Sequence, residues 1–207
     1  MNLDMGMMLH TGDMSYNDII RLAQEAEELG YHTFCLTEES GKEAFSLLGV
    51  LARETKRINL CTSIVNFYSR SPTTLAMAAR SIHELSGGRF GPFGLGTGGV
   101  GFMERGLAFY CASKHYHPIA EAGGFGEEAR KVYDIWQTRD FKGAAAAVSD
   151  EFMKKFTLTG DKETATKYLQ WMKAEACYPI IYPLPRHENR VEDHFITMRN
   201  VAKAANW

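Results

Sequence analysis

The stretch from Ser69 to Gly98, SRSPTTLAMAARSIHELSGGRFGPFGLGTG, contains the signals that decide the fold. Pro72 suits the first turn of a helix, where its missing N–H removes no hydrogen bond, and Ser71 can cap the helix from just outside. Apolar residues at three- and four-residue steps then form one stripe, which consists of Leu75, Ala78, Ile82 and Leu85. The glycines at 87–88 end the helix, because glycine adopts a left-handed cap at little cost. A short strand is predicted from Arg89 onward.

Three similar units are predicted before this stretch. Their strands are Leu3–Leu9, Tyr31–Thr37 and Ile58–Val65, and helical stripes run through residues 19–29 and 44–52. Ser15 followed by Asp18 resembles a capping box at the start of the first helix. Because strands and helices alternate and the strands are mostly apolar, the pattern predicts a parallel sheet that is covered on both faces.

The pattern changes after Gly98, where the sequence has helical texture and no convincing strand from about 103 to 172. Helices are predicted at 127–137, at 144–148 and after a capping Asp161; a fifth strand is predicted at 178–184 and a last helix at 191–204. We expect one domain over 1–207, made of four βα units (1–98), a mainly helical segment (99–176), and the last strand and helix (177–207).

Composition narrows the class of protein. The net charge of −2 gives no electrostatic case for binding nucleic acid or an anionic membrane surface. No apolar run approaches the roughly 18 residues of a membrane span, and the first ten residues do not read as a signal peptide. The four cysteines are far apart, with no CxxC pair, and those in the predicted strands are expected to be buried free thiols. We therefore expect a cytoplasmic protein.

Polar residues stand where the predicted strands end, and parallel α/β folds bind ligands at that edge. They are His10, Glu38, Glu39, Ser63, Asn66 and Thr97. The alternative interpretation is that each is polar only because it faces water. The glycines of Gly94-x-Gly96-x-x-Gly99 could also indicate a dinucleotide turn, but they follow the fourth strand and no helix begins directly after them.

No metal site is predicted. His115 and His117 would share a face only on a strand, and their surroundings read as helix or loop. His187-Glu188 lacks the second histidine of a zinc-protease helix, since His194 lies too far along the chain.

At this point the sequence resembles a known family. GKEAFSLLGVLARETKRINLCTSIVNFYSRSPTTLAMAARSIHELSGGRF, followed by GLGTG, is similar to the N-terminal half of the bacterial-luciferase-like flavin and deazaflavin oxidoreductases, of the methylenetetrahydromethanopterin reductase type. Residues 106–185 resemble that group's C-terminal segment. The family fold is an eight-stranded (β/α) TIM barrel of about 250 residues. The resemblance therefore implies an α/β fold derived from that barrel: an incomplete barrel of about five parallel strands, lacking the middle strands, with an added helical C-terminal half.

The resemblance also implies roles for individual residues. Glu38, Asn66 and Thr97 match positions that line the family's cofactor cleft, and Ser63–Ile64 would carry a non-proline cis peptide, which costs about 3 kcal/mol or more. His10 or Glu38 would be the proton donor or the polar group near the reacting carbon. The expected cofactor-binding residues are Glu39, Ser63, Ile64, Asn66, Thr97 and Gly98.

Two functions follow from the resemblance. The first is an oxidoreductase that transfers hydride between coenzyme F420 or FMN and a small-molecule substrate. The second is a shortened, non-catalytic relative that serves as a flavin-binding or structural dimeric protein. The absence of a counterpart to the family's later phosphate-binding loops leaves open the alternative that no cofactor binds. An open sheet has edges that must be covered, so we expect a homodimer or larger homo-oligomer, with the segment 103–176 across the open side.

Overall fold

The computed structural model describes residues 3–12, 14–38, 42–65, 70–94, 107–156, 162–174, 178–183 and 191–205. The chain forms two compact units, of which the first combines residues 1–100 with 165–207 and the second spans residues 101–164. We call them the sheet unit and the helical unit. The expectation of one domain over the whole chain stays a prediction.

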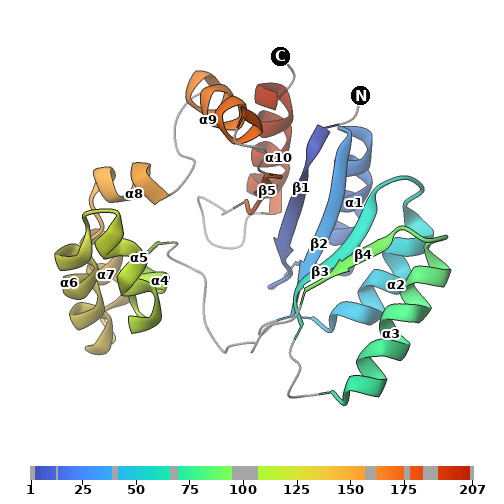
Figure 1. Cartoon of the computed structure of the whole chain (residues 1–207), viewed down its shortest axis with the longest axis horizontal. Helices are drawn as coiled ribbons and strands as arrows, with labels where there is room; N and C mark the ends of the chain where they lie inside the picture. The colour runs from blue at the N-terminus through green and yellow to red at the C-terminus, as the bar shows by residue number, and fades with distance from the viewer. Residues whose placement is uncertain are drawn as a thin grey trace. The chain divides into compact units, whose positions relative to one another are not determined.

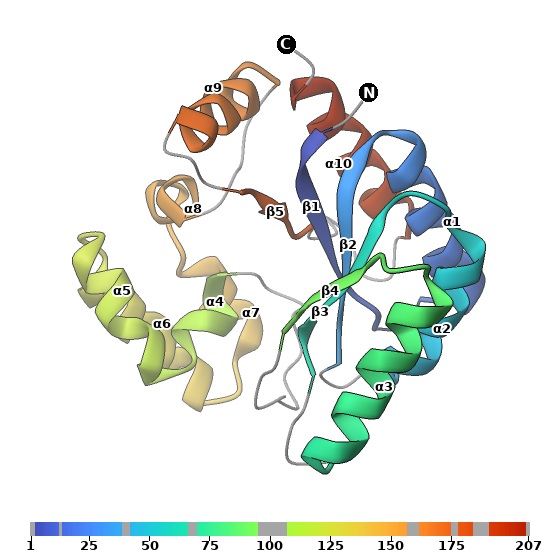
Figure 2. The same ribbon diagram turned by 45° about the vertical axis from the view of Figure 1, so that its right-hand side comes forward.

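The sheet unit is built on five parallel strands in the order β4-β3-β2-β1-β5 (Figures 1 and 2). The strands are β1 (Leu3–His10), β2 (Tyr31–Thr37), β3 (Asn59–Ile64), β4 (Phe90–Phe93) and β5 (Ile180–Ile181). The parallel, unclosed sheet is thus confirmed, with β1, β2 and β3 each followed by a helix, although β5 is much shorter than the predicted strand. It pairs with β1 on the side away from β2, where Gly6 lies opposite Ile180.

Helices pack against one face of this sheet, as Figure 2 shows. They are α1 (Tyr16–Glu28), α2 (Ala44–Glu54), α3 (Pro72–Leu85) and α10 (Val191–Ala205), and the unit also contains α9 (Lys162–Ala174). Phe34 and Leu36 of β2, together with Leu60 of β3, belong to the hydrophobic core between strands and helices. Because side chains alternate along a strand, Thr33, Cys35, Thr37 and Cys61 point to the opposite side, which we call the inner face.

The two ends of α3 show why their capping residues are needed. Ser71 accepts a hydrogen bond from the Thr74 N–H (3.1 Å), and Pro72 is the first residue of α3. Gly87 and Gly88 have φ values of 67° and 91°, the left-handed conformation that ends the helix.

Arg89, which follows the two glycines, ties three elements together. Its guanidinium donates to the carbonyl oxygens of Ala52 (3.0 Å), Thr55 (3.0 Å) and Ile58 (2.6 Å), and to the Thr55 hydroxyl (3.1 Å). It also donates to the carbonyl of Ser86 (2.9 Å). One side chain therefore satisfies carbonyl groups at the end of α2, at the end of α3 and before β3.

A second charged side chain organises the turn between α2 and β3. One carboxylate oxygen of Glu27, on α1, accepts hydrogen bonds from the backbone N–H groups of Lys56, Arg57 and Ile58. Burial raises the pKa of Glu27, but these three donors and the charge of Arg57 outweigh it, so the pKa lies below its usual value. The carboxylate thus anchors the loop in its ionised form.

The helical unit has its own small core. It contains α4 (Leu107–Cys111), a 3₁₀ turn (Lys114–Tyr116), α5 (His117–Ala122), α6 (Gly126–Gln137), α7 (Phe141–Ala146) and α8 (Asp150–Phe156). The Phe125 and Phe152 rings stack in parallel with centroids 4.7 Å apart. The helical texture predicted after Gly98 is therefore confirmed over residues 107–156, whereas the predicted cap Asp161 lies outside the described residues.

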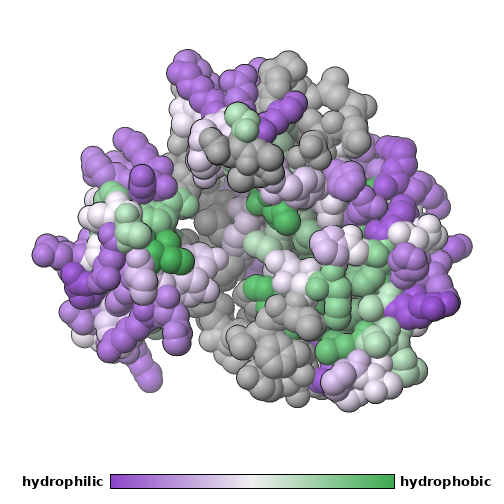
Figure 3. Space-filling view, viewed as in Figure 1, coloured by the Kyte–Doolittle hydropathy of each residue, from purple (hydrophilic) through white to green (hydrophobic). Residues whose placement is uncertain are grey.

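Apolar side chains are also exposed on the sheet unit. Figure 3 shows hydrophobic residues gathered at the surface in the region that β4 and α3 occupy in Figure 1. Val50 of α2 is 44% exposed, and Met77 and Leu85 of α3 are 66% and 48% exposed. Leu85 was predicted to belong to the buried stripe of α3, in which Leu75 and Ile82 are buried. None of the helices in the described ranges has the length and apolar character that crossing a membrane requires.

Two expectations are wrong. Cys35 and Cys61 are not free thiols: they form a disulfide, because they are register partners on neighbouring strands with Cα atoms 4.6 Å apart. The peptide bond between Ser63 and Ile64 is not cis; among the described residues the cis bond is Gly91–Pro92. At Ser63 the chain instead accommodates a register shift, since Leu36 pairs with Thr62 and Thr37 with Ile64.

Candidate functional site

The carboxyl ends of three adjacent strands meet at one level. His10 at the end of β1 is the register partner of Thr37 at the end of β2, and Thr37 is in turn the partner of Ile64 at the end of β3. In parallel α/β folds, ligands bind beyond this edge. We call this row the strand-end layer, and it places the predicted residues His10 and Ile64 on either side of Thr37.

His10 is half-buried, and the loop after it is fixed in place. The Thr11 hydroxyl accepts a hydrogen bond from the Lys42 N–H (3.1 Å), and the Lys42 ammonium donates to the Gly12 carbonyl (3.2 Å). Gly12 has a φ of +38°, and a Cβ atom there would lie 3.5 Å from Nδ1 of His10. The loop therefore passes close to the imidazole at the end of β1.

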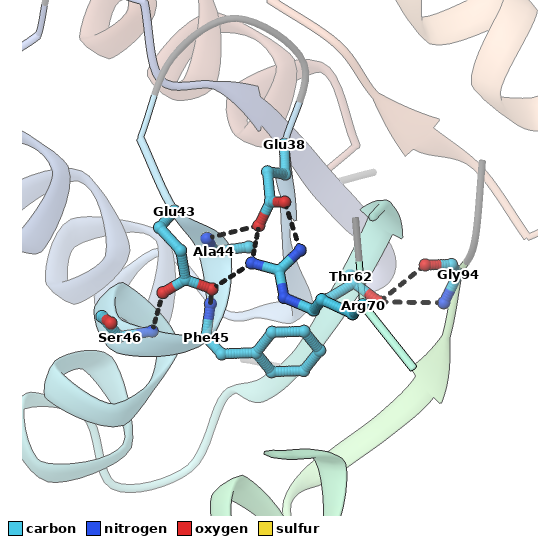
Figure 4. Close-up of polar contacts among 8 residues, drawn as sticks. All are labelled: Glu38, Glu43, Ala44, Phe45, Ser46, Thr62, Arg70 and Gly94. Atoms are coloured by element: carbon cyan, nitrogen blue, oxygen red, sulfur yellow. Dashed lines mark hydrogen bonds and ion pairs between the residues drawn. The ribbon is translucent and has the colours of Figure 1, made fainter. Parts of the chain in front are cut away.

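Glu38, the second predicted acid, is engaged by Arg70 (Figure 4). The two terminal guanidinium nitrogens of Arg70 donate to the two carboxylate oxygens of Glu38, at 2.5 and 2.9 Å. The Ala44 N–H at the start of α2 also donates to this carboxylate, at 3.0 Å. The guanidinium lies 5.4 Å from the ring centroid of Phe45. Glu38 is therefore an acceptor that anchors α2, whereas a proton donor at this position would need a protonated carboxyl.

Glu43 completes this cluster. Its carboxylate accepts hydrogen bonds from the N–H groups of Phe45 (3.0 Å) and Ser46 (2.7 Å), and from Arg70 (2.7 Å). Burial raises the pKa of Glu43, but the bonds from Ser46 and Phe45 and the charge of Arg70 hold it below its usual value. The bond to Glu38 raises the pKa of Arg70. Two carboxylates and one guanidinium thus form a fixed ionic cap on α2.

The exit of β4 is held against β3. The Thr62 hydroxyl donates to the carbonyl of Gly94 (2.9 Å) and accepts from its N–H (3.0 Å), as Figure 4 shows. A Cβ atom at position 94 would lie 2.4 Å from the Ser63 carbonyl oxygen, so only glycine fits here. Gly94, the first glycine of the run after β4, therefore makes a close backbone contact with β3, whereas the rest of the predicted motif lies outside the described residues.

The structure adds His194 to the site, a residue that sequence reasoning considered only as a zinc ligand. It lies in the first turn of α10, which contacts β1, and it is 8% exposed. Its Nδ1 is buried and has no hydrogen-bond partner among the described residues. Burial lowers the pKa of His194, and the charge of His10 lowers it further against the opposing effect of Asp193. In the sequence, the position of His194 shortly after the last predicted strand is the signal that could have placed it near the strand-end layer.

The structure does not place the other predicted residues in the site. Glu39, Asn66, Thr97 and Gly98 lie outside the described residues, so their cofactor-binding roles stay predictions. Ser63 is described and half-buried, next to Ile64. Within the described ranges, no three His, Cys, Asp or Glu side chains are grouped closely enough to hold a metal ion.

Two open hollows lie on the helical unit, with volumes of about 510 and 660 Å³. Glu127 and Glu128 line both of them, and Glu121 lines the first. Arg130 also lines the first and Lys131 the second, so each lining carries charges of both signs and gives no indication of a particular ligand. The strand-end layer therefore remains the candidate site, although neither hollow lies there.

A parallel, unclosed sheet whose first three strands each lead into a covering helix is an α/β fold of the kind found in TIM-barrel-like proteins. The family model described as luciferase-like monooxygenase matches residues 3–108, which is half of the chain. The chain belongs to the luciferase-like monooxygenase family.

Individual relatives cover parts of the sequence. Rv3520c of Mycobacterium tuberculosis, assigned as a coenzyme F420-dependent oxidoreductase, is 37% identical over 112 residues, which are 54% of this chain and 31% of the relative. The 5,10-methylenetetrahydromethanopterin reductase of Archaeoglobus fulgidus is 33% identical over 94 residues, 45% of this chain and 28% of the enzyme. The matched segment thus spans less than a third of either relative.

Solved structures share the fold. The coenzyme F420-dependent tetrahydromethanopterin reductase from Methanopyrus kandleri aligns with a TM-score of 0.77 at 12% identity, over 98% of this chain and 99% of that one. The monooxygenase RslO1 from Streptomyces bottropensis aligns with a TM-score of 0.62 at 15% identity, over 98% of each chain. At these identities the likeness shows the fold alone.

Proposed function

We propose that the chain is an oxidoreductase that binds F420 or FMN at the strand-end layer and transfers a hydride to or from a small substrate. The observation that carries the proposal is the level ending of β1, β2 and β3, which sets His10 beside Thr37 and Ile64. Family membership supports the redox chemistry, and the assignment of the Mycobacterium tuberculosis relative as F420-dependent favours F420 over FMN.

The residues present fit a flat redox ring with a polar edge. The loop at Gly12 passes beside the His10 imidazole, and the buried Nδ1 of His194 is available for a further hydrogen bond within the described part of the chain. Thr37 donates to the Leu9 carbonyl (3.3 Å), which keeps the ends of β1 and β2 in register. When bound, the cofactor supplies the hydride carrier. His10 holds or moves a proton at its ring nitrogens, while Glu38 and Arg70 fix α2 beside it.

The binding step is tested by titrating the protein into FMN and, separately, into F420, while the fluorescence of each cofactor is recorded. We expect saturable quenching by at least one of them. Absence of binding for both at high micromolar protein would remove the oxidoreductase proposal.

The proton-handling step is tested with paired variants. We expect His10→Gln to lower turnover by roughly 10²-fold or more while cofactor affinity stays within error, as for the loss of a general acid. Glu38→Gln should mainly lower stability. Full turnover in His10→Gln would show that another group moves the proton, and a large loss in a folded Glu38→Gln variant would return the role to Glu38.

A second candidate function is a non-catalytic dimeric protein of the same family. The engagement of Glu38 by Arg70 and Ala44 favours it, because one of the two expected acids is committed to structure. We also propose that the exposed apolar side chains of α2 and α3 form a homodimer surface. Sedimentation should then give a dimer that Met77→Glu dissociates; a stable monomer of the parent protein would contradict the dimer.

A further inference from the structure

The disulfide between Cys35 and Cys61 joins two central strands of the sheet. The two residues are direct register partners of β2 and β3, and each is 1% exposed. Neither belongs to the hydrophobic core that Phe34 and Leu60, their neighbours in sequence, form with the helices. The bond therefore lies on the inner face of the sheet.

Its position along the strands relates it to the candidate site. Thr37 of the strand-end layer follows Cys35 by two residues, so it is the next side chain of β2 on the same face. The distance along the strand is roughly 7 Å. The disulfide is thus one inward-facing row below the layer to which we assign the redox cofactor.

The disulfide is not the only link between β2 and β3. These strands already pair from Thr33–Asn59 to Thr37–Ile64, on both sides of the cysteines. Its neighbours on β2 on the inner face are the hydroxyl residues Thr33 and Thr37, and Met8 of β1 is the register partner of Cys35. Cys35 and Cys61 are each 1% exposed, which excludes bulky protein reductants from direct contact, so the reductant considered below is a small dithiol.

We propose that Cys35 and Cys61 form a reversible two-electron thiol–disulfide site whose state sets the affinity of the strand-end layer for its cofactor. The second half of this proposal rests on the proposed function. A thiolate of a small dithiol attacks one sulfur atom, the Cys35–Cys61 bond breaks, and a mixed disulfide forms. The second thiol of the reductant then displaces it as a cyclic disulfide. Two electrons and two protons have passed to the protein, which holds two thiols; a small disulfide reverses the reaction.

Reduction of the Cys35–Cys61 disulfide alters the candidate site by changing how the side chains around it pack. Two thiols require van der Waals separation where the disulfide had a covalent bond, and a close-packed sheet cannot absorb that change at one place. Thr37, two residues away and hydrogen-bonded to Leu9, is the first strand-end residue to shift. The spacing of β1, β2 and β3 at the candidate site then differs between the two states.

The first experiment counts thiols without using any cofactor. Protein incubated with oxidised or reduced dithiothreitol is acid-quenched, denatured and alkylated, and the peptides of Cys35, Cys61, Cys111 and Cys177 are measured by mass spectrometry. We expect a Cys35–Cys61 link after oxidation that native-state reduction cleaves and reoxidation restores. Failure to form the link, or cleavage only after denaturation, would overturn the proposal.

The second experiment measures coupling. We expect the Kd for FMN or F420 to differ by about fivefold or more between oxidised and reduced protein, a typical coupling magnitude. The double variants Cys35→Ser/Cys61→Ser and Cys35→Ala/Cys61→Ala should show one Kd in both conditions, at the value of the reduced protein. The matched control Cys111→Ser, in the helical unit, should keep both values.

Two outcomes separate this proposal from the proposed function. Equal Kd values for oxidised and reduced parent protein would overturn the coupling and leave the oxidoreductase proposal intact. No binding in either state would overturn the proposed function together with the coupling, while the thiol counts would still decide whether the site is reversible. If both double variants fail to fold, the comparison of the two states of the parent protein decides the coupling.

Discussion

Arg70 donates to both carboxylate oxygens of Glu38, and with the same guanidinium it reaches Glu43 at the start of α2. Both partners of the first pair have side chains that are 16% exposed. The pair is thus shielded from water enough to contribute to stability, but it is not fully buried. Its function in the described structure is to fix the first turn of α2 against the end of β2.

Removing either partner should therefore destabilise the protein. We expect Glu38→Gln and Arg70→Gln each to lower the free energy of unfolding by about 1–3 kcal/mol, between the values for exposed and buried pairs. Urea unfolding of both single variants and the double variant gives the coupling energy, expected at about 1 kcal/mol. Purely additive effects would contradict the pairing.

Replacing Arg89 should lower the stability of the protein more than replacing other arginines of the same region. Arg89→Ala leaves several carbonyl groups of α2, α3 and the β3 entry without their donor, and we expect a loss of about 2–4 kcal/mol in the free energy of unfolding. The control is Arg80→Ala, which removes an exposed pair with Glu84 on α3. It should change stability by less than about 0.5 kcal/mol. Similar losses in the two variants would contradict the bridging role.

Gly94 tests the close approach of β4 to β3. A Cβ atom there meets the backbone oxygens of Ser63 and Thr62 at 2.4 and 2.5 Å, so Gly94→Ala must displace the strand exit, at an expected cost of about 2–4 kcal/mol. Gly87→Ala is the control, because it has a φ of +67° and nothing within 4 Å of the new carbon. It should cost only about 1 kcal/mol of backbone strain. The ranking is checked by thermal and urea unfolding.

The lowered pKa of His194 predicts that the stability of the protein depends on pH. Its pKa in the folded protein lies below the ordinary 6.5, because burial and the nearby His10 disfavour its charged form against the opposing effect of Asp193. Above pH 6.5 the residue is neutral whether the chain is folded or unfolded, and its contribution is fully present. As the pH falls below 6.5, the unfolded chain binds a proton that the folded chain does not.

Stability is then lost by up to about 1.4 kcal/mol per pH unit until the pH reaches the folded pKa. Urea unfolding from pH 8 to pH 5 measures this, and His194→Gln should flatten the difference between pH 7 and pH 5.5. An unchanged slope in the variant would show that other groups cause it.

Local sequence signals predicted most of the sheet unit. Ser15, Ser71, Gly87 and Gly88 adopt the cap conformations expected of them, because such caps depend on neighbouring residues only. The resemblance of the Gly41–Phe90 segment gave the barrel-derived fold, which periodicity alone leaves open.

Predictions that depended on distant partners fared differently. Cys35 and Cys61 are 26 residues apart and meet only through strand register, so no spacing rule could pair them. Glu38 was chosen as an acid from its place at a strand end, but its environment depends on Arg70, 32 residues later. His194 approaches His10 only once α10 packs against β1. Contacts created by the tertiary fold decide which polar residues are available for chemistry.

Because β5 is synthesised long after β1, the pairing of these two strands forms late. Gly6 forms its hydrogen bond to the Pro179 carbonyl across more than 170 residues of chain. On the ribosome, β1 to β4 can assemble while the outer side of β1 still lacks the strand that completes it. A nascent chain halted before Ile180 should therefore expose this hydrogen-bonding edge to chaperones or to other nascent chains, and release of the last strand would end that exposure.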